Sequence, residues 1–261
     1  MKITAPAMML ATTLFLANQE CESQSLIVNA ADLIYHPDIN FVGAQSNYIN
    51  TMPGANNANG DYEQTSSVKY NNQNLMTIKW SDIANSNTIA INKVDLYHVP
   101  GQNIHINLVI PGAFAASAQH YNAPKQIQIK ENAFANIGAA GVTLDVAFQY
   151  PHFSNYSVLF ANNCSRMFAN SSSITSIDFS AADTYSVANM ESMFEGCDNL
   201  RELRLDNFSM WHCNNSQNMF LACSSLVTLR WGTAAVNLPT GPSYDPETTL
   251  LQVFSLLDLG S

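Results

Sequence analysis

The sequence predicts an α/β solenoid in which each unit, about 20–26 residues long, supplies one short strand and one short helix or 3₁₀ turn. Two observations lead to this prediction. A 26-residue pattern repeats from position 163 onward. Within each repeat, a stretch with apolar residues three or four apart is followed by two apolar residues at alternate positions. A unit of this kind cannot cover its own apolar face, so consecutive units have to stack and share one core.

The repeat is defined by residues that recur at the same spacing in three consecutive units. They are Asn163, Asn189 and Asn215; Met167, Met193 and Met219; Phe168, Phe194 and Phe220; and Ser171, Cys197 and Cys223. The alternating pairs that follow are Ile177 and Phe179, Leu203 and Leu205, and Leu229 and Trp231. These pairs predict a strand with one face turned inward. The segment before each Met-Phe pair predicts the short helix, and the asparagine is expected to bond backbone groups where the chain turns.

The pattern Asn-x-x-x-Met-Phe-x-x-Cys-x-x-Leu-x-x-Leu-x-Leu over 163–231 resembles the BspA-like leucine-rich repeat family. Looser Ala-Phe units, at Ala113-Phe114 and Ala133-Phe134, resemble it from about residue 104. The resemblance implies a leucine-rich-repeat-like fold. It also implies a non-catalytic, extracellular protein that binds a host or another protein.

Four segments are predicted along the chain. They are an N-terminal apolar helix and anchoring segment over 1–52, an Asn/Gly/Ser-rich linker or long loop over 53–75, the repeat solenoid over 76–237 and a C-terminal capping helix over 238–261. The apolar stretch 1–19 is interpreted as a retained helix that docks on a partner, with a secretory signal as the alternative. Asp245-Pro246-Glu247 predicts the start of the capping helix, because an acidic cap precedes Pro at the first helical position.

The composition limits the classes of partner. The chain of 261 residues has 20 Asp and Glu against 10 Lys and Arg, a net charge of −10, and no run of basic residues, which excludes nucleic acid as a primary partner. Only 11% of its residues are charged, compared with about 25% in an ordinary domain. The polar surface is therefore largely neutral, with 30 asparagines. Few titratable groups are available and the family resemblance implies a non-catalytic protein, so we expect no enzyme, catalytic residue or cofactor.

The cysteines do not have the spacing of a metal site. No Cys-x-x-Cys occurs and the six histidines are dispersed, so we expect no metal. Cys197 and Cys223 share one repeat position and are interpreted as small buried residues. A disulfide between them stays open at this point, because it requires Cα atoms within about 7 Å.

Trp211 and Tyr185 are the predicted contact residues, since exposed aromatic side chains on a repeat surface are suited to binding. We expect a host surface protein or glycan to bind through the solenoid and proteins of a larger assembly to bind through residues 1–52. A second copy of the chain is a further expected partner. The repeats, the neutral composition and the small size favour a phage virion component (a head decoration, head fibre or tail-associated protein) at the virion surface. The alternative is a secreted or surface-anchored adhesin of a bacterium or protist.

Overall fold

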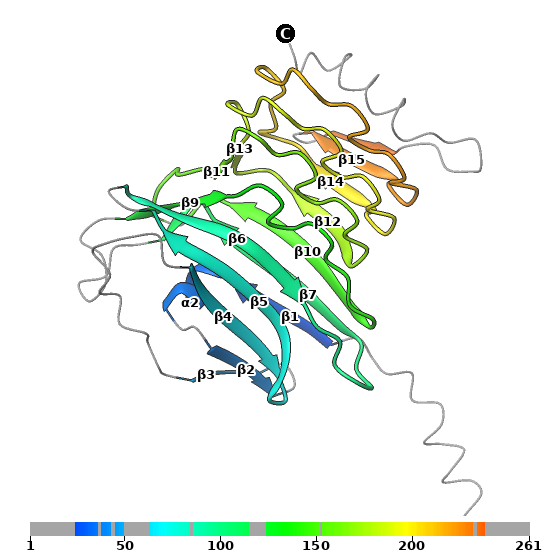
Figure 1. Ribbon diagram of the computed structural model, residues 1–261. Coiled ribbons are helices and arrows are strands. Elements are labelled where there is room, and N and C mark those ends of the chain that lie inside the picture. The colour runs from blue at the N-terminus through cyan, green and yellow to red at the C-terminus, as the bar shows by residue number, and fades with distance from the viewer. Residues whose placement is uncertain are drawn as a thin grey trace, which may run out of the picture.

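The computed structural model of the protein describes residues 24–35, 38–42, 45–49, 63–83, 86–114, 124–151, 153–231 and 234–237. Within these residues the chain is almost entirely β-structure, in two sheets (Figure 1). The one helix found there is α2 (Ala30–Tyr35), outside the repeats. The prediction of an α/β solenoid with a helix in each unit is therefore wrong. The apolar helix predicted over 1–19 and the capping helix predicted over 238–261 lie outside the described residues.

Seven strands form the first sheet, and they run parallel except for the last pair. In spatial order they are β1 (Gln24–Asn29), β7 (Ile104–Pro111), β10 (Val142–Gln149), β12 (Ile174–Asp178), β14 (Glu202–Arg204), β15 (Thr228–Trp231) and the antiparallel β16 (Ala234–Asn237). The 26-residue repeat appears as an in-register ladder, because Ser176 pairs with Glu202 and Glu202 with Thr228. We call residues 131–231 the repeat stack.

Nine strands form the second sheet. In spatial order they are β13 (Ala182–Asp183), β11 (Val158–Phe160), β9 (Lys125–Ile129), β6 (Thr88–Leu96), β5 (Gln73–Asp82), β4 (Glu63–Tyr70), β2 (Asp38–Val42) and β3 (Gln45–Ile49), with β8 (Ala113–Phe114) paired to β9. In Figure 1, β4, β5 and β6 lie in front of β1, β7 and β10. Buried apolar residues of both sheets form one continuous cluster, so the sheets share a single core.

The N-terminal part of the chain is built into these sheets. From Gln24 it forms β1, which pairs with β7, and the chain predicted as a linker forms β4 and β5 from residue 63 onward. Residues 76–96, predicted as the start of the solenoid, belong to the antiparallel strands β5 and β6. The polar composition of β4 led to the prediction of a linker, because a polar residue occupies one of the strand's core positions. Ser66 is fully buried, donates to the carbonyl of Leu33 at 2.7 Å and accepts from Trp80 Nε1 at 3.0 Å.

Hydrogen bonding between units explains why the segments around the Met-Phe pairs are turns and not helices. The N–H groups of Ser192, Phe194 and Gly196 donate to carbonyls of the next unit at 2.9, 2.9 and 2.8 Å. The intervening N–H groups of Met193 and Glu195 bond to carbonyls three residues back. In an α-helix every N–H donates to the carbonyl four residues back. A segment in which alternate N–H groups donate to another unit therefore cannot be an α-helix.

Left-handed residues on both sides of each Met-Phe pair reinforce this result. They are Arg166, Ser192 and Asn218 directly before the pair, and Asn170, Gly196 and Ala222 two residues after its Phe, with φ between 54° and 70°. A left-handed residue interrupts a right-handed helix, and for an L-residue it costs about 1–2 kcal/mol. At Gly196 an added Cβ would also lie 2.6 Å from Asn170 Oδ1.

Substitutions at the left-handed position after Phe should have opposite effects in consecutive units. We expect Gly196→Ala to lower the free energy of unfolding by about 1–2 kcal/mol, because the new side chain is strained and meets Asn170. Ala222→Gly relieves the same strain and should leave that free energy unchanged or raise it by up to about 1 kcal/mol. Urea denaturation measures both. The control Ala188→Gly, at an ordinary φ, should cost about 0.5–1 kcal/mol, and an equal loss in Ala222→Gly would contradict the explanation.

Candidate binding surface

A column of four phenylalanine rings runs through the repeat stack. The ring centroids of Phe134, Phe168, Phe194 and Phe220 follow one another at 5.1, 5.4 and 5.3 Å, with planes within 18° of parallel. Paired strands lie about 4.8 Å apart, so one ring per unit is held near stacking distance by the backbone. The 26-residue spacing identifies the last three rings, and the looser Ala-Phe unit supplies Phe134. The three repeated methionines are fully buried as well.

The small residue after each Met-Phe pair connects neighbouring units. Ser171 Oγ, Cys197 Sγ and Cys223 Sγ donate to the carbonyls of Phe134, Phe168 and Phe194 at 2.5, 2.9 and 3.0 Å. Cys197 and Cys223 are free thiols, so the disulfide left open by the sequence is not formed. Burial raises the pKa of Cys197 to about 12 and raises the pKa of Cys164 as well. Because the thiolate is the form that reacts or binds metal, these thiols act as structural donors.

The repeated asparagines fix the turn that begins each unit. Their Oδ1 atoms accept the N–H of the residue two positions on, at 3.0, 3.0 and 3.2 Å for Asn163, Asn189 and Asn215. Nδ2 of Asn163 donates to Glu131, and Nδ2 of Asn215 to Glu191, both at 3.0 Å. Their backbones form successive parallel bridges. Each asparagine thus holds its own turn, and the first and third also bond a carboxylate of the preceding unit.

Tyr185 and Trp211, the predicted contact residues, occupy the same position in consecutive units, one repeat period apart. Their side chains are 54% and 53% exposed. His212 packs edge-on against Tyr185 with ring centroids 4.5 Å apart, and its Nδ1 donates to the Tyr185 carbonyl at 2.8 Å. Just before Tyr185, Thr184 Oγ1 accepts the Ser209 N–H at 2.7 Å and donates to the Ser209 carbonyl at 3.0 Å. The two aromatic side chains are therefore presented from a backbone that is fixed between units.

Three further exposed aromatic residues lie in the connection between β10 and β11. Tyr150, Phe153 and Tyr156 are 46%, 48% and 44% exposed. The Tyr150 hydroxyl accepts a hydrogen bond from Asn207 Nδ2 at 2.9 Å, which connects this segment to the chain after β14. These three are not predicted as contact residues from the sequence, because they fall outside the 26-residue repeat.

The charged side chains on the solvent-facing side of β12, β14 and β15 form ion pairs. Arg204 lies 2.7 Å from Asp206 and 3.6 Å from Asp178, and Arg230 lies 2.5 Å from Glu202. Residues of these strands line a hollow of about 640 Å³ on this face. Because the pairs are partly exposed, each contributes only about 0–1 kcal/mol to stability. They make the face polar without a cluster of unpaired charge.

The described residues contain neither a candidate metal site nor a candidate membrane-spanning helix. No group of three or more His, Cys, Asp and Glu side chains there could hold a metal ion. No helix in that part of the chain is both long and apolar enough to cross a membrane.

A family model matches part of the chain. The model of a family described as "Mycoplasma protein of unknown function, DUF285" matches residues 140–237. This range contains the three repeated units and the strands from β10 to β16. No curated protein matches the chain, and no solved structure matches it.

The buried Cys197 thiol should make the protein less stable as the pH rises. Its pKa is raised from 9.0 to about 12 on folding, so between pH 9 and 12 the unfolded chain loses this proton while the folded chain keeps it. The unfolded state then binds fewer protons, and the free energy of unfolding falls by up to about 1.4 kcal/mol per pH unit for this thiol.

Cys197→Ser tests this effect because Ser171 makes the equivalent bond in the preceding unit. We expect urea denaturation between pH 8 and 10.5 to give a shallower alkaline decline for the variant than for the wild type. Identical slopes would show that the thiol does not contribute.

Proposed function

We propose that this chain is a non-enzymatic structural and binding protein. It displays the repeat stack from a larger assembly and contacts a host surface protein or glycan. The observation that carries the proposal is the presence of Tyr185 and Trp211, both more than half exposed, at one position in consecutive units. Exposed tyrosine and tryptophan side chains are frequent centres of binding energy.

The rigidity of the scaffold supports this proposal. The stacked rings of Phe168, Phe194 and Phe220 and the bonds between Thr184 and Ser209 hold the two aromatic positions at a constant separation. A partner that binds pre-organised side chains pays a smaller entropic cost of ordering them. The aromatic pair is therefore suited to a partner that spans two neighbouring units.

Replacing the aromatic pair should abolish most of the binding. We expect Tyr185→Ser and Trp211→Ser each to weaken the binding of the fluorescently labelled protein to whole host cells at least about tenfold. Phe153→Ser is the matched control, because Phe153 is similarly exposed but lies outside the pair. A loss of binding in the control alone would place the contact in the connection between β10 and β11.

The assembly that we propose first is a phage virion, in which the chain serves as a head decoration, head fibre or tail-associated protein. The neutral surface, the repeats and the small size support it. The second candidate is a secreted or surface-anchored adhesin. The observation that favours the adhesin is that the matched family model is named for mycoplasma proteins.

Fractionation of the natural source separates these two candidates. We expect native mass spectrometry to find the chain in a particle fraction, within a symmetric complex. A monomeric chain recovered from the cell envelope or culture fluid, and missing from particles, would reject the virion and support the adhesin.

A further inference from the structure

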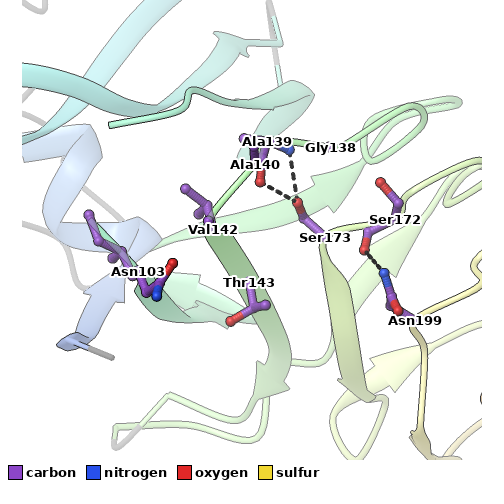
Figure 2. Close-up of a pocket in the computed structure, with 11 residues that line it drawn as sticks. Asn103, Gly138, Ala139, Ala140, Val142, Thr143, Ser172, Ser173 and Asn199 are labelled. Carbon is purple, nitrogen blue, oxygen red and sulfur yellow. Dashed lines mark hydrogen bonds between the residues drawn. The ribbon is translucent and has the colours of Figure 1, made fainter. Parts of the chain in front are cut away.

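A pocket of about 560 Å³ lies where the chain enters four neighbouring parallel strands of the first sheet (Figure 2). Asn103 precedes β7, the turn 138–141 precedes β10, Ser172 precedes β12 and Asn199 precedes β14. In Figure 2, Asn103 lies on one side of the pocket and Ser172 and Asn199 on the other, with Thr143 between them. The pocket is thus built from turns that are far apart in the sequence.

The lining of this pocket is polar but uncharged. Among the described residues its polar side chains are amides and hydroxyls, and the exposed Ala140 supplies apolar surface. A charged ligand would lose hydration here without gaining a counter-charge, which is unfavourable. Neutral hydroxyl groups can exchange their hydrogen bonds to water for bonds to amides and hydroxyls at little cost.

Internal hydrogen bonds fix the orientation of two polar groups in the pocket. Asn199 Nδ2 donates to the Ser172 carbonyl at 2.8 Å, which leaves Asn199 Oδ1 as an acceptor. His105 Nε2 lies 3.3 Å from the Asp145 carboxylate, and its Nδ1 lies 2.9 Å from Thr143 Oγ1. Whichever of Nδ1 and the Thr143 hydroxyl donates in this bond, the Thr143 oxygen keeps at least one free lone pair. The Thr143 oxygen therefore remains as a second acceptor.

Two other groups supply donors. The Asn103 amide and the Ser172 hydroxyl make no side-chain hydrogen bond to any described residue, and both line the pocket. The pocket therefore combines two oriented acceptors with two adaptable groups that donate and accept. Neighbouring hydroxyls of a sugar ring have the same combination, and the apolar face of the ring can rest on the exposed Ala140.

We infer that this pocket binds a neutral saccharide. The inference rests on the proposed binding function, for which it names one ligand class and one location. That location is separate from Tyr185 and Trp211, which follow β12 and β14 in the chain, whereas the pocket residues precede these strands.

Saturation-transfer NMR on the full chain tests this inference. The probes are the methyl glycosides of glucose, galactose, mannose and N-acetylglucosamine, with methyl glucuronide as the charged comparison. We expect at least one neutral glycoside to bind and the glucuronide to bind at least about tenfold more weakly. Asn103→Ala and Ser172→Ala should each raise the Kd about fivefold, the effect of losing one hydrogen bond.

Gly138→Ala provides an independent variant, because an added Cβ would lie 2.8 Å from Ser172 Oγ and narrow the pocket. Gly138 has no left-handed φ, and the serine hydroxyl can rotate, so we expect an unchanged thermal midpoint and weaker binding. Tyr185→Ser and Trp211→Ser should leave saccharide binding unchanged.

Three results would overturn the pocket assignment: no neutral glycoside binds, the glucuronide binds as tightly, or Asn103→Ala and Ser172→Ala have no effect. Saccharide binding that is lost only in Tyr185→Ser and Trp211→Ser would move the ligand to the aromatic pair and preserve the proposed function. If the wild-type protein binds host cells but no saccharide, the pocket assignment alone is rejected. If the wild-type protein binds neither host cells nor any saccharide, the proposed function is rejected as well.

Discussion

The hydrogen bonds between consecutive turn segments are the constraint on which the repeat stack depends. Phe168 N–H donates to the Met193 carbonyl, and Phe194 N–H donates to the Met219 carbonyl, both at 2.9 Å. Because these bonds start at the Met-Phe pair, they bring successive rings to stacking distance. They also place the thiol of Cys197 against a carbonyl of the preceding unit. Left-handed backbone on both sides of each pair is the conformational cost of this arrangement.

Much of the C-terminal half could be predicted from its period. A 26-residue repeat fixes which strand positions lie opposite one another, as the pairing of Leu203 with Leu229 shows. The predicted helices failed because apolar residues three or four apart also occur in successive three-residue turns, and Ser192 and Gly196 signal the turns only once their backbone is known. The N-terminal half has no repeat. There the strand β4 has the polar composition of a loop, and even one of its buried positions is a serine. Ser66 is accommodated in the core because its hydroxyl is hydrogen-bonded.

The two candidate sites also differ in how well they can be predicted from the sequence. The sequence could propose Tyr185 and Trp211 as contact residues because aromatic residues outside the core positions of a repeat are recognisable, and both are exposed in the structure. The saccharide pocket could not be identified, since Asn103, Thr143 and Asn199 come together only through the order of the parallel strands. Each of these residues is an ordinary loop or strand residue in the sequence. Their chemistry depends on neighbours that are distant along the chain.

The in-register pairing of Ser176, Glu202 and Thr228 determines how the gene can change in length. A tandem duplication of one whole repeat adds a rung in which every side chain keeps its face and partners, whereas a one-residue slip within a strand turns each side chain to the other face. Val146 of β10 pairs with Ile177 of β12, although the two residues are further apart in the sequence than one repeat period. The additional residues are accommodated in the chain between these two strands. In evolution such a chain extends its length in whole units and varies its surface through the loops between them.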